Sequence, residues 1–251
     1  MPVLFAHRGA AVEVPENTLE SFRRAIEVGA GALEMDVHAT RDGVVVVAHD
    51  ADGARMCGVP RALAHEDWTE VSRWDAGHGF TDAAAARPWA GRGLRVPRLA
   101  EVLEAFPGTL LNVDLKAPIA DEVVALVRAA RAEERVCLAS FSSATIRRVR
   151  ALGHRGPTAL SRGEVARLLA LPAVLQRGLL RPGGAAAQIP VALAQPWVVE
   201  RSRALGLRVD VWTVNDEATA RRMLDLGVDG IMTDDPRRLA PFVGAATAPS
   251  R

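Results

Sequence analysis

The 251-residue sequence predicts an α/β protein that folds as a (β/α)8 TIM barrel. The first observation is that short apolar runs alternate with amphipathic helical segments, as in repeated βα units. The second is that α/β barrels commonly reach this length as one domain, so a single barrel domain over residues 1–251 is expected. The third is that acidic, basic and imidazole side chains follow the predicted strands at their carboxyl ends, where barrels of this class bind ligands.

Nine apolar runs are strand candidates, one more than a closed barrel needs. They cover residues 3–6, 33–37, 44–48, 109–115, 135–140, 158–161, a weak run at 185–191, 208–214 and 230–233. Helices are expected over residues 18–28, 99–106, 119–132, 143–152, 163–169, 196–205 and 217–226. Four residues at strand or loop ends are candidate helix caps: Thr18, Ser143, Asp216 and Asp234.

The connection between the second and third runs resolves the strand count. Residues 40–43 end in Asp42-Gly43 and are too short for a parallel crossover, whereas Asp-Gly favours a hairpin. Residues 44–48 should therefore fold back antiparallel on the end of the second strand. The turn would place Asp36 opposite Ala48 or His49 and bring Glu34 close to both. Eight barrel strands remain.

Residues 50–96 do not fit one βα unit, because they carry Trp68, Trp74 and Trp89 among scattered glycines. We interpret them as a small insertion packed over one end of the barrel. An irregular surface excursion without a chemical role is an equally good interpretation.

Composition excludes several classes of protein. The formal net charge is +1, so a nucleic-acid partner is not expected. With 49% hydrophobic and 24% charged residues, the chain is globular rather than disordered. Cys57 and Cys137 have no CxxC partner and predict neither a zinc site nor a disulfide framework. No targeting segment is visible and residues 182–199 carry several prolines, so a cytoplasmic protein without stable membrane association is expected. The sequence leaves the oligomeric state open.

Carboxylates converge at the predicted strand ends. Glu34 and Asp36 have the period-two spacing that projects both side chains to one face of a strand, and Asp114 and Lys116 repeat it. Three acids at this density suit a hard divalent cation that prefers oxygen ligands, Mg²⁺ or Ca²⁺. A network paired by Arg8 and other arginines is the alternative.

Two histidines lie beside this acidic cluster. Imidazole titrates near neutrality, so His7 and His49 could serve as general base and general acid in one displacement. Arg8 and Lys116 add cations that could hold an anionic group, and the set suggests phosphoryl transfer. The remaining histidines are expected to be non-catalytic: His38, His65, His78 and His154.

Lys116 is the single lysine among 31 basic residues. An ammonium is a compact point charge, whereas a guanidinium is a wide planar fork. A lysine retained in so arginine-rich a chain favours a position where the fork does not fit. The alternative is that the arginines reflect a GC-rich coding background and that this lysine is retained by chance.

These residues fall in motifs that resemble the glycerophosphodiester phosphodiesterase family. The motifs are His7-Arg8-Gly9, Pro15-Glu16-Asn17-Thr18, Glu34-Met35-Asp36-Val37, Thr40-Arg41-Asp42-Gly43, His49-Asp50, Asn112-Val113-Asp114-Leu115-Lys116, Ser140-Phe141, Trp212-Thr213-Val214-Asn215 and residues 227–234. The resemblance spans nearly the whole chain. It implies a barrel with an insertion after the second histidine, and metal-dependent cleavage of glycerophosphodiesters to sn-glycerol 3-phosphate and an alcohol.

The resemblance also implies roles for individual residues. His7 and His49 would be the acid/base pair, and one divalent cation would be bound by Glu34, Asp36 and Asp114. Arg8 and Lys116 would contact the phosphate, and Phe141 and Trp212 would flank the glycerol or the leaving group. The chain departs from the family at Asp114, where Glu is usual. It also departs after His49-Asp50, where the customary Thr-Leu and Arg-Thr pattern is degraded to Asp52-Gly53-Ala54-Arg55-Met56.

Two other functions stay open. One is a lysophospholipase D-like or inositol-lipid phosphodiesterase on a similar barrel, for which residues 182–199 are the candidate apolar rim. The other is a non-catalytic barrel that binds phosphate esters.

Overall fold

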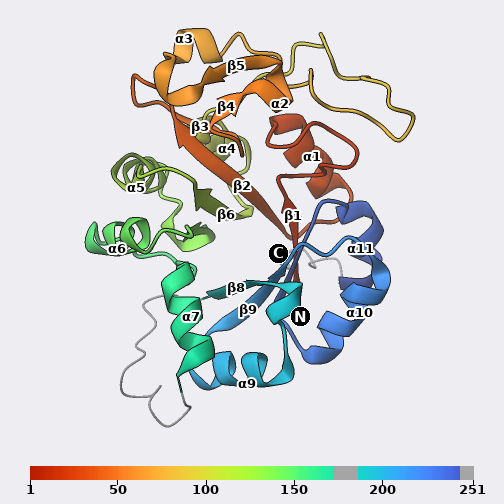
Figure 1. The fold of residues 1–251 in the computed structure, drawn as a ribbon, viewed down its shortest axis with the longest axis vertical. Helices are drawn as coiled ribbons and strands as arrows, with labels where there is room; N and C mark the ends of the chain where they lie inside the picture. The colour runs from red at the N-terminus through yellow and green to blue at the C-terminus, as the bar shows by residue number, and fades with distance from the viewer. Residues whose placement is uncertain (172–185, 244–251) are drawn as a thin grey trace.

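The computed structural model describes residues 1–171 and 186–243, and its main sheet curls into a parallel barrel (Figure 1). Neighbouring strands follow the order β7-β6-β2-β1-β10-β9-β8, and every pairing along this path is parallel. The strands are β1 (Val3–His7), β2 (Ala32–Ala39), β6 (Leu110–Leu115), β7 (Val136–Ala139), β8 (Ala186–Pro190), β9 (Arg208–Trp212) and β10 (Gly230–Thr233). The predicted TIM-barrel fold is confirmed.

The segment between β7 and β8 closes the barrel with two isolated bridges. Thr158 pairs with Leu138 of β7, and Ala159 pairs with Ala186 of β8. The predicted strand over residues 158–161 is therefore wrong as a regular strand, although its place in the barrel is right. Pro157 precedes the segment and offers no backbone donor, while Ser161 already begins a helix as its N-cap, so few residues remain for a ladder.

Helices surround the barrel on its outer face (Figure 1). They are α1 (Leu19–Glu27), α4 (Leu99–Ala105), α5 (Ala120–Ala129), α6 (Ser143–Ala151), α7 (Arg162–Ala170), α9 (Pro196–Ala204), α10 (Glu217–Leu226) and α11 (Pro236–Val243). The predicted helices are confirmed with shifted ends, and α11 was not predicted. Its buried Leu239 and Val243 have helical spacing, but Pro241 inside the segment obscures the pattern.

The caps were predicted in part. Thr18 accepts from Ser21 N and Asp216 accepts from Thr219 N, as expected. The prediction for Ser143 was wrong by one residue, because Ser142 caps α6. The prediction for Asp234 was also wrong by one residue, because Asp235 accepts from Arg238 N at the start of α11 whereas the Asp234 side chain contacts His7.

The predicted hairpin forms at the end of β2. β3 (Val45–Val47) pairs antiparallel with β2, with Val37 opposite Val47. Ala48 N donates to Asp36 O at 2.9 Å, so Asp36 and Ala48 are neighbours as the turn predicted. This hairpin delivers His49 to the carboxyl end of the barrel.

The insertion at residues 50–96 has regular secondary structure. It contains β4 (Asp52–Gly53), α2 (Ala54–Cys57), β5 (Val59–Ala62), a 3-10 turn (Leu63–His65) and α3 (Trp68–Val71), all beside the β2–β3 end of the barrel (Figure 1). It has its own apolar cluster, in which Leu63, Val71 and Trp74 pack with Val46 of β3. Because Val46 belongs to the hairpin, packing in the insertion fixes β3, the strand that leads to His49.

Within residues 1–171 and 186–243, no helix has the length and apolar character needed to cross a membrane.

Candidate active site

A pocket opens at the carboxyl ends of the barrel strands and is lined by every residue to which the sequence assigned a catalytic, substrate-binding or metal-binding role. Its lining is His7, Arg8, Glu34, Asp36, His49, Asn112, Asp114, Lys116, Ala139, Ser140, Phe141, Ala159, Leu160, Gln188, Trp212, Thr213 and Met232. Sheet register explains this convergence. His7 of β1 lies opposite Glu34 of β2, and Asp36 of β2 lies opposite Asp114 of β6, so three neighbouring strands present these groups side by side.

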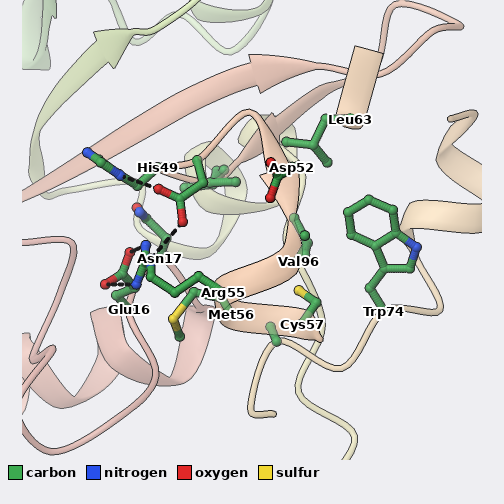
Figure 2. A pocket seen from close by; sticks show the side chains of 15 residues that line it. Glu16, Asn17, His49, Asp52, Arg55, Met56, Cys57, Leu63, Trp74 and Val96 are labelled. Carbon is green, nitrogen blue, oxygen red and sulfur yellow. Dashed lines mark hydrogen bonds and ion pairs between the residues drawn. The ribbon is translucent and has the colours of Figure 1, made fainter. Parts of the chain in front are cut away.

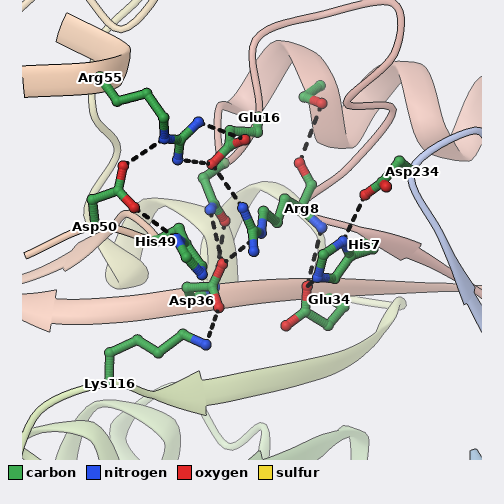
Figure 3. Close-up of polar contacts among 12 residues, drawn as sticks. His7, Arg8, Glu16, Glu34, Asp36, His49, Asp50, Arg55, Lys116 and Asp234 are labelled. Atoms are coloured by element: carbon green, nitrogen blue, oxygen red, sulfur yellow. Dashed lines mark hydrogen bonds and ion pairs between the residues drawn. The ribbon is translucent and has the colours of Figure 1, made fainter. Parts of the chain in front are cut away.

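His7 is held by the carboxylate of Asp234, which directly follows the last strand, β10. Its Nδ1 lies 2.6 Å from Asp234 Oδ1, and its Nε2 lies 4.0 Å from Glu34 Oε2 (Figure 3). Burial alone would lower the pKa of His7, but the hydrogen bond to Asp234 and the charge of Glu34 outweigh it and raise that pKa. With Nδ1 occupied, Nε2 is the nitrogen left for proton transfer at the pocket.

His49 has a matching arrangement on the other side of the pocket. Its Nδ1 lies 2.7 Å from Asp50 Oδ1, which again leaves Nε2 for the pocket (Figure 3). His38 Nε2 donates to the backbone carbonyl of His49 at 3.1 Å. His38 therefore supports the backbone of His49, and that it is not itself catalytic stays a prediction.

Arg8 adopts a left-handed backbone conformation, with φ of 58°. Such a φ is uncommon outside glycine, and here it aims the Arg8 amide at Glu34 Oε2, 3.0 Å away. The Arg8 guanidinium contacts Asp36 Oδ2 at 3.1 Å and Glu16 Oε1 at 3.2 Å. Asn17 Nδ2 donates to the same Asp36 oxygen at 3.2 Å. Asp36 is thus fixed by the β1–α1 loop.

Lys116 lies between two of the acids. Its Nζ is 2.8 Å from Asp36 Oδ1 and 2.6 Å from Asp114 Oδ2. Burial would raise the pKa of Asp36, but Lys116 and Arg8 lower it below the ordinary value. For Asp114 burial prevails over Lys116, and its pKa is raised. Burial would lower the pKa of Lys116, but the two carboxylates raise it, so the ammonium stays charged.

Of the three pocket acids, Glu34 is the one that contacts no lysine or arginine side chain within the described residues. It is 4% exposed, and burial, together with the charge of Asp36, raises its pKa to about 8. A carboxylate in this position favours either a proton or an added cation.

The fit to a divalent cation follows from these acids. Among the described residues, no group of three or more His, Cys, Asp or Glu side chains is arranged to hold a metal ion. The Lys116 ammonium contacts Asp36 and Asp114 directly. The donor set nevertheless suits Mg²⁺ or Ca²⁺, since all the candidate ligands are carboxylates and Glu34, buried beside Asp36, needs a cation or a proton to neutralise its charge. The paired-network alternative describes the contacts of Asp36, but it leaves Glu34 unexplained.

Two aromatic side chains border the same pocket. The rings of Phe141 and Trp212 meet edge to face with centroids 6.0 Å apart, and Lys116 Nζ lies 5.8 Å from the Phe141 centroid. Phe141 is 57% exposed, so it stands at the rim rather than in the core.

Sequence reasoning missed the supporting residues. Asp234 was interpreted as a cap, and Asp50, Glu16 and Asn17 were given no role. Each lies in or beside a matched motif, and that was the available signal. Their partners are distant in sequence, as the separation of 227 positions from His7 to Asp234 illustrates, and only the closed barrel brings them together.

Fold and pocket together define the class: a (β/α)8-barrel protein whose strand ends gather carboxylate-held imidazoles, acids and cations around one cavity. The chain belongs to the glycerophosphoryl diester phosphodiesterase family, whose family model matches residues 7–238. This confirms the resemblance drawn from the motifs.

Individual relatives cover nearly the whole chain. A glycerophosphodiester phosphodiesterase of Caldanaerobacter subterraneus is 30% identical over 96% of this chain and 97% of its own length. A lysophospholipase D of Homo sapiens is 28% identical over 95% of this chain and 85% of its own. The crystal structure of a glycerophosphodiester phosphodiesterase from Agrobacterium tumefaciens has a TM-score of 0.79 and 28% identity, and the match covers 94% of this chain and 97% of that one.

Proposed function

We propose that this protein hydrolyses glycerophosphodiesters to sn-glycerol 3-phosphate and an alcohol. The observation that carries the proposal is the pair of imidazoles, His7 and His49, each bound at Nδ1 by a carboxylate and both lining the pocket that contains the acids and cations. Family membership supports the same substrate class.

Proton transfer is assigned to the two Nε2 atoms. His7, whose pKa is raised, accepts the proton of the attacking hydroxyl, and His49 protonates the oxygen of the departing alcohol. The attacking group is water or the 2-hydroxyl of the glycerol itself, which would give a cyclic phosphate first. In both routes the second histidine lowers the barrier by preventing a free alkoxide from leaving.

Cations bind the phosphate. Arg8 and Lys116 contribute fixed positive charge for the phosphoryl oxygens, and Glu34, Asp36 and Asp114 would hold one divalent cation, Mg²⁺ or Ca²⁺. When bound, that ion supplies further positive charge for the phosphoryl group. Phe141 and Trp212 are proposed to flank the glycerol or the leaving group at the rim.

The test is release of glycerol 3-phosphate from glycerophosphocholine, glycerophosphoethanolamine and glycerophosphoglycerol. Each reaction is run after EDTA treatment and again with added Mg²⁺ or Ca²⁺. We expect no turnover after EDTA and recovery with one of the two ions. Absence of hydrolysis with either ion, together with no bound cation by metal analysis, would instead support a non-catalytic barrel that binds phosphate esters.

A lysophospholipase D-like activity is the second candidate, favoured by the human relative of that name and by exposed aromatic side chains. Phe141 is 57% exposed and Trp197, at the start of α9, is 46% exposed. Trp197 belongs to the predicted apolar rim at 182–199, of which residues 182–185 lie outside the described part. Comparing detergent-dispersed lysophosphatidylcholine with glycerophosphocholine distinguishes the two activities, because only the first substrate carries an acyl chain for such a rim.

A further inference from the structure

Arg55, in α2 of the insertion, contacts two carboxylates beside the pocket, one next to His49 and the other next to Arg8. Its Nε lies 2.6 Å from Asp50 Oδ2, and the other oxygen of Asp50 contacts His49 Nδ1. Its Nη2 and Nη1 lie 2.7 and 3.1 Å from the two oxygens of Glu16, and Glu16 also contacts Arg8. Figure 3 shows this continuous chain of charged groups from His49 to Arg8.

The backbone around α2 fixes the position of Arg55. Gly79 packs so closely on α2 that a methyl group there would overlap the carbonyl oxygen of Arg55, and Gly79 N donates to Met56 O at 2.8 Å. Gly58 ends α2 in the left-handed conformation, with φ of 68°. On the barrel side, Arg55 and Glu16 border a second pocket whose opposite side is formed by Trp74 (Figure 2).

We propose that Arg55 is a positioning residue for the proposed hydrolysis: it fixes the Asp50 carboxylate so that Asp50 holds the His49 ring with Nε2 facing the leaving group. The inference rests on the proposed function, in which His49 protonates the departing alcohol. It gives the insertion a chemical role, because one of its side chains sets the orientation of a histidine on the barrel.

A guanidinium suits this position for a geometric reason. It presents a planar fork with donors on three nitrogens, so one group can bind both Glu16 oxygens and still reach Asp50. A lysine ammonium is a single point charge and cannot satisfy both acids in that geometry. Within the described part of the chain, the Asp50 side chain contacts Arg55 and His49 only. Without Arg55 it would keep the contact with His49 alone, and the His49 ring turns about its own side-chain torsions.

The chain offers a matched control in the same insertion. Arg61 is 47% exposed, like Arg55 at 46%, and pairs with Glu66 at 3.0 Å while lying over the Trp74 ring. It contacts none of the pocket residues that are assigned a role. Arg61→Ala therefore measures how much the loss of one surface ion pair in the insertion affects stability and activity, and this effect is small for exposed pairs.

The experiment compares two substrates whose leaving groups differ in how much they need protonation by a general acid. Glycerophosphocholine has a poor leaving group, whereas glycerol 3-(4-nitrophenyl phosphate) releases a phenolate that needs little protonation. For Arg55→Ala we expect kcat on the choline ester to fall about 10- to 100-fold, as for a weakened general acid. The nitrophenyl ester should lose less than threefold, and KM should change little for either.

Further variants test the route through Asp50. Arg55→Lys should not restore the choline activity, and Arg55→Ala should cost little more in an Asp50→Asn background, because residues in one network are non-additive. Arg61→Ala should keep both activities, and melting temperatures identify any variant that fails to fold.

Four outcomes separate the proposals. An equal loss on both esters, or full additivity with Asp50→Asn, overturns the positioning role while the hydrolysis stands. Near-normal kcat in Arg55→Ala on the choline ester does the same. A wild-type protein that cleaves neither ester overturns the proposed function and this inference with it.

Discussion

Asp234 and His7 connect the two ends of the barrel sequence through a hydrogen bond of 2.6 Å. His7 ends β1 and Asp234 directly follows β10, and these strands are neighbours in the closed sheet. Asn215 Nδ2 donates to the second Asp234 oxygen at 2.7 Å, and Asn215 Oδ1 accepts from the Asp234 amide at 2.9 Å. The carboxylate that orients His7 is thus itself held on both sides.

Asp234→Asn should remove the charge that raises the pKa of His7. With His7 as the base, activity is lost when pH falls below its pKa, so a lower pKa moves the acid limb of the pH profile of kcat/KM to lower pH. The rate at the optimum should also fall, by about 10²-fold or more, because an amide can stabilise the wrong tautomer. Asp235→Asn is the neighbouring control. An acid limb that stays in place in Asp234→Asn would contradict the role given to Asp234.

His7→Ala and His49→Ala should each lower kcat by roughly 10²–10⁴-fold, the usual contribution of a positioned proton-transfer group. Circular dichroism and melting temperature should change little, since both side chains border an open pocket. His65→Ala, on the 3-10 turn of the insertion, should retain full activity. If both active-site variants turn over at a near-normal rate, the acid/base assignment is wrong.

Lys116→Arg should abolish most turnover while the protein still folds. Nζ lies 2.8 and 2.6 Å from two carboxylates, a space that accommodates a compact ammonium, and a guanidinium fork would displace Asp36 or Asp114. Kinetics with glycerophosphocholine and a thermal melt check this. Arg148→Lys is the control, because it makes the reverse exchange at an exposed ion pair with Asp121. Activity near that of the wild type in Lys116→Arg would mean that the lysine is not required.

Glu164→Gln tests what holds the irregular barrel segment. Arg150 contacts Glu164 at 2.6 Å, Thr158 Oγ1 at 3.1 Å and the Ala159 carbonyl at 3.3 Å. Burial would raise the pKa of Glu164, but Arg150 and the Ser161 amide lower it. A depressed folded-state pKa stabilises the fold above the unfolded value near 4.5, and this stabilisation is lost as pH falls through the folded pKa.

The variant should therefore be less stable than the wild type by about 1 kcal/mol at pH 7, by urea unfolding. The difference should shrink below about pH 4.5, as the wild-type carboxyl takes up a proton. A difference that stays constant with pH would show that the effect is steric rather than electrostatic.

Sequence patterning was sufficient for most of the fold. Alternating apolar runs and helical segments predicted the barrel, and Asp42-Gly43 predicted the hairpin that carries His49, because both signals are local. The weak points were local conflicts. Residues 158–161 have strand composition but are confined between Pro157 and the Ser161 cap, and α11 was obscured by Pro241.

For the site, the sequence by itself determined which groups meet at the strand ends, since period-two spacing and strand polarity fix the side and the end of the sheet to which Glu34, Asp36 and Asp114 point. The tertiary structure alone decided which side chains contact these acids and the groups around them. Asp234 reaches His7 through barrel closure, Lys116 contacts two acids across neighbouring strands, and Arg55 reaches Asp50 and Glu16 from the insertion. These pairings depend on distances between segments remote along the chain, which only packing sets.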